Sequence, residues 1–374
     1  MNNKRESVQV LGCDGKELPI IYPVITTYTH HAHLLSILGA YKYTDAWVYG
    51  NYIQLFCKNN YMQDSWSDFY FPNSYETKPY DLCSWINVEK IAWDILDDKN
   101  GIVEFLIKAI NNNCYISMMI DYYYVKKSYY YNKEHYSHEV LISGYDRKKE
   151  EFICADFLFR SQKYSIETVG FIEIEEAFEN CNKTKLEFFK NKLLHLISMN
   201  ENSTLVFSEQ NILNHISEYY KGSIPEYWRL FSGEELENLA FGLNVYEAII
   251  KYLKQVISTG SKYLDSRPIY LLCDHKTIMV QRMKMLLKKG SEEYHNYYQE
   301  LMDEYEKLEK QLNAILIATM RYNYDNNEKY LLQGIEELNS IYLCEMKILT
   351  PLINKLESKK CIIEQSVVLG VKEN

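Results

Sequence analysis

The amino-acid sequence predicts an α+β domain followed by an all-α helical bundle. Short apolar runs separated by Gly, Pro and Asn turns fill the first part of the chain, and long amphipathic segments dominate after "SMNENSTL" (198–205). Within the first part, helix-like periods precede strand-like periods, which is an α+β order. We therefore expect one domain over residues 1–200 and a second, helical domain over residues 201–374.

The first elements have the pattern of helices. Apolar residues recur at helical spacing over His31–Tyr43, and Thr29 is available as the N-cap. A second helix is expected around Ala46–Cys57, and a third over Asn87–Asp98, where a polar start precedes an apolar stripe. The segment "IVEFLIKAINNN" (102–113) predicts a further helix.

The period then changes to that of strands. Cys114–Val125 is rich in β-branched and aromatic residues, and His138–Asp146 alternates apolar with polar positions. The short polar stretch Asp146–Glu150 separates the latter from Glu151–Phe157, so these two runs predict a hairpin. One further strand and helix are expected in "SIETVGFIEIEEAFEN" (165–180).

The second part predicts an antiparallel helical bundle. Its first amphipathic segment begins with Ser232 and places Glu235 three residues later, which is a capping box. Three further long segments follow, joined by short Gly- or Asn-containing loops, and such loops join antiparallel neighbours. Asp274 is expected to cap one of these helices, since adjacent Cys273, Asp274 and His275 cannot converge on one metal ion.

Composition excludes several classes of protein. The net charge of -10 argues against a protein that binds the phosphate backbone of nucleic acids. The nine cysteines are odd in number and lack CxxC spacing, which argues against a disulfide framework and a zinc site. The start "MNNKRESVQVL" lacks the apolar core of a secretory signal, and no run approaches the ~18 apolar residues of a membrane span. We therefore expect a cytoplasmic protein with reduced thiols.

The segment "HYSHEVLISGYDRKKEEFICADF" contains the candidate catalytic residues. His138 opens the first strand of the expected hairpin, and Asp156 ends the returning strand, so the two can approach each other across the pair. An aspartate bound to one imidazole nitrogen fixes the tautomer and leaves the other nitrogen as a base. The sequence therefore predicts a catalytic His138–Asp156 pair.

This His-x-Val-x-x-x-Gly-Tyr-Asp pattern, followed by a strand carrying Asp, resembles the His/Asp half of papain-like and bacteriocin-processing cysteine peptidases. Its place behind an N-terminal helix and before a helical tail looks like the butirosin biosynthesis protein H family, over about Pro19–Phe178. The resemblance implies a papain-like domain that moves an acyl group from a carrier-protein thioester to an amine in antibiotic assembly. It also implies no resident cofactor, since phosphopantetheine arrives on the carrier.

The nucleophile departs from the family pattern. In that family a cysteine opens the first helix about eleven residues before an aromatic residue, here Tyr41, which places the position at His30, or at His31 in a shifted register. A thiol could come from elsewhere, with Cys13 preferred over Cys83, which precedes the helix expected at Asn87.

A reaction without an enzyme thiol is also consistent with the sequence. The amine could attack an already activated thioester directly, with His138 as base and His30 and His31 contacting the acyl carbonyl. The site could also be inactive.

The predicted function is therefore acyl transfer that forms an amide in specialised-metabolite assembly. The expected partners are an acyl- or peptidyl-carrier protein and a small amine or amino acid, with no metal, nucleic acid or membrane. A cysteine peptidase or amidase and a non-catalytic binding protein of the same pathway are the alternatives. The tyrosine-rich runs "DYYYVKK" and "SYYYNKEHY" flank His138 and would suit a flat aromatic acyl group.

Overall fold

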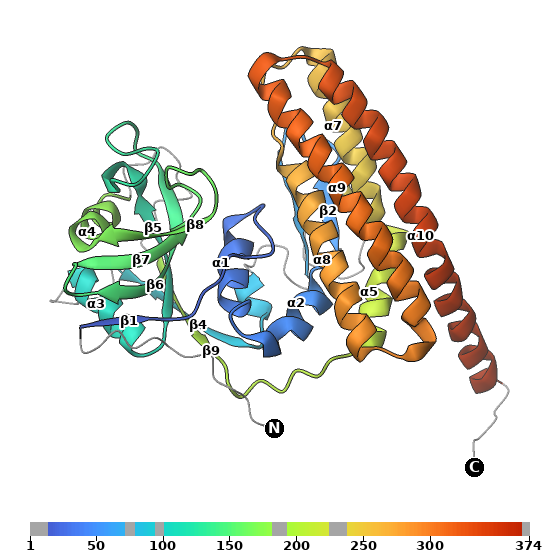
Figure 1. Ribbon diagram of the computed structural model, residues 1–374, viewed down its shortest axis with the longest axis horizontal. Helices are drawn as coiled ribbons and strands as arrows, with labels where there is room; N and C mark the ends of the chain where they lie inside the picture. The colour runs from blue at the N-terminus through green and yellow to red at the C-terminus, as the bar shows by residue number, and fades with distance from the viewer. Residues whose placement is uncertain (1–13, 72–78, 94–100, 182–192, 224–237, 369–374) are drawn as a thin grey trace. The chain divides into compact units, whose positions relative to one another are not determined.

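The computed structural model describes residues 14–71, 79–93, 101–181, 193–223 and 238–368, with side chains of the last helix described to residue 360. Contacts divide the chain into two compact units, whose elements are shown in Figure 1. Unit 1 comprises Met1–Asp45 and Thr77–Leu205, and unit 2 comprises Ala46–Glu76 and Val206–Asn374. The sequence led us to expect continuous domains meeting near residue 200, whereas residues 46–76 group with the second unit. The class is α+β with a helical C-terminal region.

Unit 1 is built on an antiparallel sheet. Among the described residues its strands follow the order β4-β9-β5-β6-β7-β8, and β1 pairs with the far half of β6. The strands are β1 (Gly15–Glu17), β4 (Ile86–Ala92), β5 (Tyr115–Asp121), β6 (Ser137–Asp146), β7 (Glu151–Asp156), β8 (Ser165–Gly170) and β9 (Leu193–Met199). The expected hairpin is confirmed, because β6 and β7 pair across the polar turn that the sequence indicated.

Helices pack against this sheet. They are α1 (Thr29–Leu38), α3 (Gly101–Asn111) and α4 (Phe171–Glu179), with 3-10 turns η1 (Lys42–Thr44), η2 (Pro79–Leu82) and η4 (Tyr122–Tyr124). Figure 1 shows α3 and α4 beside each other, and both contact β5. In α3 the buried residues Ile102, Leu106 and Ile110 recur at helical spacing, which explains why this segment forms an amphipathic helix. Helix α1 contacts β7 instead.

Two expected helices were wrong, and so was the cap expected at Asp274, which lies inside the helix Arg267–Lys289. Of the segment expected as a helix over Asn87–Asp98, residues 87–92 belong to strand β4, which pairs with β9 along its whole length, and residues 94–98 lie outside the described residues. Ile86, Val88 and Ile91 are β-branched and suit a strand, and pairing with a partner distant in sequence outweighed the local helical pattern. The expected helix Ala46–Cys57 ends early and continues as a strand of unit 2. The chain therefore forms strands before Cys114, the residue at which the sequence led us to expect the first strand.

Unit 2 combines a small sheet with long helices. The strands β2 (Leu55–Lys58), β3 (Ser67–Phe69) and β10 (Leu239–Phe241) form an antiparallel sheet in the order β10-β2-β3. The helical elements are α2 (Asp45–Asn51, whose first residue belongs to unit 1), α5 (Glu209–Lys221), η8 (Gly242–Asn244), α7 (Val245–Thr259), α8 (Arg267–Lys289), η9 (Glu292–Tyr294), α9 (His295–Asp325) and α10 (Lys329–Val368). Figure 1 shows α7, α8, α9 and α10 lying side by side, as expected for a bundle. The capping box at Ser232 and Glu235 lies outside the described residues.

The bundle encloses a buried ionic cluster that the sequence did not reveal. Lys276 of α8 lies 2.7 Å from Glu345 of α10, and both side chains are fully buried. Three phenol groups donate to the same carboxylate, namely those of Tyr219, Tyr246 and Tyr305. Because burial of a charge is tolerated when it is paired and hydrogen-bonded, these contacts account for the two ions in an apolar core.

Within the described residues, none of the helices combines the length and apolar character that crossing a membrane requires.

Candidate functional site

The site begins with the His138–Asp156 pair of the β6–β7 hairpin. His138 Nδ1 lies 2.9 Å from Asp156 Oδ2, so the hairpin brings the two residues together as expected. The aspartate side chain is fully buried, and 20% of the histidine side chain is exposed. Asp156 Oδ1 accepts a hydrogen bond from the Phe157 amide at 2.7 Å. The carboxylate is thus fixed by the backbone on one side and holds the imidazole with its other oxygen.

A β-bulge sets the face on which the pair meets. Near the turn Tyr145 pairs with Phe152, but beyond the bulge Leu141 pairs with Ala155, so β6 carries one extra residue between these points. Because successive side chains of a strand alternate between faces, the shifted register places His138 and Asp156 on one face. The unshifted register would place them on opposite faces. The bulge is therefore required for the contact between His138 and Asp156.

The other imidazole nitrogen of His138 faces a hydroxyl group. Thr29 Oγ1 lies 3.3 Å from His138 Nε2, and Thr29 is the first residue of α1. The sequence led us to expect Thr29 as the helix cap, which was wrong: Tyr28 occupies the N-cap position and makes no side-chain capping bond. Side chains of Thr29, His138 and Asp156 therefore form a continuous chain of contacts that sequence reasoning missed. Thr29 directly precedes His30, the position where the family would have its cysteine, and it carries a hydroxyl. These two facts could have identified Thr29 from the sequence.

The environment of His138 suits a base. Burial is the largest influence on its pKa and lowers it, but the charge of Asp156 and the hydrogen bond to it oppose burial, and the net pKa is raised. The neighbouring phenol of Tyr122 is buried, and burial together with the Asp156 charge raises its pKa, which keeps it neutral. The ring centroids of Tyr122 and Tyr136 lie 6.5 Å and 6.4 Å from that of His138. Members of both tyrosine-rich runs thus lie beside the base.

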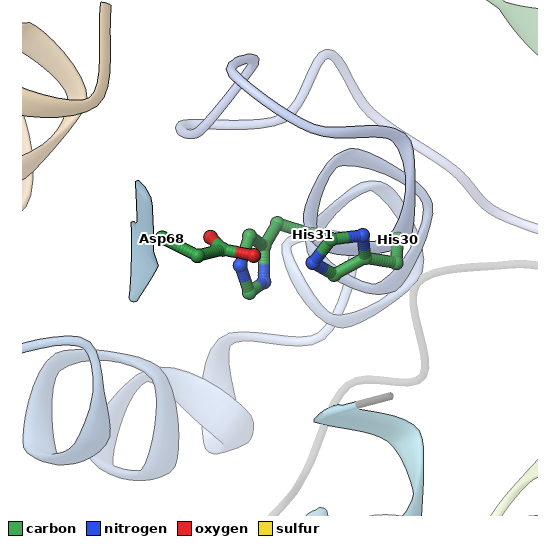
Figure 2. Close-up of side chains that lie close together, drawn as sticks. All are labelled: His30, His31 and Asp68. Carbon is green, nitrogen blue, oxygen red and sulfur yellow. The ribbon is translucent and has the colours of Figure 1, made fainter. Parts of the chain in front are cut away.

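His30 and His31 follow Thr29 in the first turn of α1, and their ring centroids lie 4.1 Å apart. Figure 2 shows the two histidine side chains on this helix. His31 is buried, whereas His30 is partly exposed and stacks on Tyr28. The third residue labelled in Figure 2, Asp68, belongs to β3 of the other unit. The expected role of these histidines in contacting an acyl carbonyl stays a prediction.

His33 has a structural environment. Its side chain is fully buried, Nδ1 lies 3.1 Å from the Tyr164 hydroxyl, and Nε2 lies 3.3 Å from the Glu139 carbonyl oxygen. Burial lowers its pKa, so the ring stays neutral near neutral pH. It ties α1 to the start of β6 and to the segment after β7, and thereby steadies the approach of α1 to His138.

The cysteine candidates give no activated thiol among the described residues. Cys13 lies outside those residues. Cys83 was expected to precede a helix, but strand β4 follows it, and burial raises the pKa of its thiol to about 12. Cys154 lies on the same strand as Asp156, and burial followed by that carboxylate charge raises its pKa. Since the thiolate is the nucleophilic form, Cys83 and Cys154 are poor nucleophiles at neutral pH.

A second histidine–aspartate pair lies just before β6. His135 Nδ1 is 2.6 Å from Asp121 Oδ2, and Asp121 also accepts hydrogen bonds from the Tyr123 and Tyr136 amides. The His135 ring stacks on Tyr123 at 4.3 Å. These contacts hold the loop that leads into β6, and they make His135 a matched control for experiments on His138.

Comparison with known proteins adds no relative: no family model matches the chain, and no curated protein matches it.

Proposed function

We propose that unit 1 catalyses acyl transfer from a carrier-protein thioester to an amine, with formation of an amide. The observation that carries the proposal is the His138 ring, held by Asp156 at Nδ1 and meeting a side chain of the α1 N-terminus at Nε2. A base that is oriented by a carboxylate and lies within hydrogen-bond reach of a hydroxyl is an arrangement that recurs in acyl-transfer sites. We also propose a papain-like relationship for this unit, on the strength of the sequence resemblance and this arrangement.

The roles of the two residues follow from their contacts. Asp156 holds the proton on Nδ1, so the lone pair of His138 lies on Nε2 and can take a proton from an attacking group. As the C–S bond breaks, the protonated ring can return that proton to the departing thiol. General-base assistance of this kind contributes about 10²- to 10⁴-fold in rate.

The substrate class rests on the resemblance and on the surroundings of the base. The resemblance to the butirosin biosynthesis protein H family suggests a donor carried on phosphopantetheine and an amine acceptor in the cytoplasm. The Tyr130 and Tyr136 rings are stacked at 4.5 Å, and Tyr136 lies next to His138. A flat aromatic acyl group would pack against such rings with about 0.5–1.5 kcal/mol beyond area burial. We therefore favour an aromatic donor over a small aliphatic one.

A cysteine peptidase is the less favoured alternative, because the group that meets Nε2 is a hydroxyl and not a thiol. Burial of the Cys83 and Cys154 thiols points the same way.

The test uses the full chain with acetyl, octanoyl and benzoyl thioesters of N-acetylcysteamine and a panel of primary amines and amino acids. Thiol release and amide mass are measured together. We expect amide formation by the native protein, a loss of about 10²- to 10⁴-fold in His138→Ala, and retention of activity in His135→Ala. Release of free acid in place of amide would favour the hydrolase, and equal rates for both variants and the native protein would exclude His138 as the base.

A further inference from the structure

We propose that Thr29 is the nucleophile of unit 1 and carries the acyl group as a threonine ester between the two half-reactions. This inference rests on the proposed acyl transfer and adds a covalent intermediate to it. It replaces both the thiol and the direct attack by the amine that the sequence left open.

The first argument is the geometry of the proton path. Thr29 Oγ1 and His138 Nε2 are separated by 3.3 Å, and His138 Nδ1 and Asp156 Oδ2 by 2.9 Å. A hydroxyl is a weak nucleophile that becomes effective when a base takes its proton, and distances in unliganded sites are often slightly longer than in the reacting complex. The order hydroxyl, imidazole, carboxylate is that of a serine-type triad.

The second argument is the position of Thr29 in α1. The residue opens a ten-residue helix whose first intrahelical bond runs from the Ala32 amide to the Tyr28 carbonyl oxygen. The backbone amides of a first helical turn point toward the N-terminus and favour negative charge there. A carbonyl attacked by Thr29 Oγ1 would develop its negative oxygen at this end of the helix, where such donors stabilise an oxyanion.

The third argument is the side chain itself. Threonine is β-branched, so its χ1 angle is restricted and its hydroxyl is held in few orientations. The helix fixes the backbone of Thr29, while His33 ties the next turn of α1 to Glu139 beside His138. Nucleophile and base are therefore positioned by rigid elements before substrate binds, which lowers the entropic part of the barrier.

The chemistry balances without a further reagent. In the first half-reaction Thr29 Oγ1 forms a C–O bond to the acyl carbon, the C–S bond breaks, and His138 passes the hydroxyl proton to the departing sulfur, which leaves as a thiol. In the second half-reaction the amine nitrogen forms the C–N bond and the C–O bond breaks. The amine proton then travels through His138 Nε2 back to Thr29 Oγ1, which restores the site.

A role as a mere positioning residue makes different predictions. In that case the Thr29 hydroxyl would only donate to Nε2 and orient the ring, no acyl group would become attached to it, and the amine would attack the thioester directly. The decisive readout is therefore covalent attachment and not the rate alone.

The experiment exposes the full chain to benzoyl-N-acetylcysteamine or 4-nitrophenyl acetate without an amine and measures intact mass and nitrophenol release. We expect one acyl group per chain, mapped to Thr29 by peptide sequencing and removed by hydroxylamine. Thr29→Val keeps the shape and should lose both the adduct and about 10³-fold or more of the amide-forming rate. Thr29→Ser should keep both, and Thr29→Cys should form a thioester adduct at the same position.

The outcomes separate this inference from the proposed function. Amide formation by the native protein and by Thr29→Val, without any adduct, overturns the nucleophile and leaves acyl transfer intact. An adduct on Thr29 that yields only free acid with every amine supports the nucleophile and overturns amide formation. Absence of an adduct from both donors in a folded native protein also overturns the nucleophile. Circular dichroism and thermal melting of each variant verify the fold.

Discussion

Replacement of Asp156 by asparagine should nearly abolish activity while leaving the shape of the site intact. The two oxygens of the carboxylate have different partners: Oδ1 accepts the Phe157 amide, and Oδ2 faces His138 Nδ1. An asparagine in the same position would keep its oxygen on the Phe157 amide, because that partner can only donate. Its NH₂ group would then face Nδ1 and donate to it.

The consequence is a change of tautomer. With Nδ1 acting as acceptor, the neutral ring of His138 carries its proton on Nε2 and can no longer take one from Thr29 or from an amine. We expect a loss of about 10⁴-fold in the rate constant, the size found when an orienting aspartate becomes an amide, which corresponds to about 5.4 kcal/mol in the barrier.

The pH profile provides an independent check. In the native protein the influence of Asp156 raises the pKa of His138 above the ordinary 6.5. Because the base acts in its neutral form, the native rate should rise with pH through a midpoint above 6.5. Asp156→Asn leaves burial unopposed by that charge, so the midpoint of its residual activity should move to lower pH.

The assay follows thiol release from benzoyl-N-acetylcysteamine between pH 5 and 9, with His135→Ala as the control. A rate within tenfold of native in Asp156→Asn, with an unchanged midpoint, would refute the assignment of Asp156 as the residue that fixes the tautomer.

Three further predictions concern stability. Lys276→Met and Glu345→Gln should each lower the free energy of unfolding, measured in urea titrations, by about 3–5 kcal/mol, because each leaves a buried partner unpaired. The double variant should recover most of this lost stability, and purely additive losses would contradict the pairing. Burial holds the pKa of His275 well below 6.5, so below that pH the unfolded chain binds a proton that the folded chain does not. The free energy of unfolding should therefore fall as the pH is lowered below 6.5, by at most about 1.4 kcal/mol per pH unit. His275→Asn should show a smaller dependence on pH. In Gly144→Ala the new Cβ would lie 2.8 Å from the Lys16 carbonyl oxygen. This close contact should lower the free energy of unfolding by about 1–3 kcal/mol and weaken the pairing of β1 with β6. An unchanged melting temperature would contradict this prediction.

The two ions of unit 2 illustrate why the sequence could not identify every important residue. Lys276 and Glu345 stand 69 positions apart on different helices, and either has the pattern of a solvent-exposed charge on an amphipathic segment. Only the packing of α8 against its neighbours places them in the core together.

The α+β class, the β6–β7 hairpin and the approach of Asp156 to His138 within it could be predicted from the sequence, whereas the bulge that puts both side chains on one face could not. The predicted features depend on residues close in the chain: two apolar runs separated by a short polar turn pair with each other almost regardless of the rest. The sequence also showed that tyrosine-rich runs flank His138, although it did not place their rings beside the imidazole.

Features that depend on distant partners emerged only from the folded chain. Strand β4 forms because β9 pairs with it. Residues 46–76 group with unit 2, where β2 pairs with β10. Thr29 meets His138 across 109 positions of sequence, and the bulge in β6 fixes the face on which Asp156 joins them. Local propensity carries no information about such pairings, because their energy appears only when the chain closes and buries the surfaces between them.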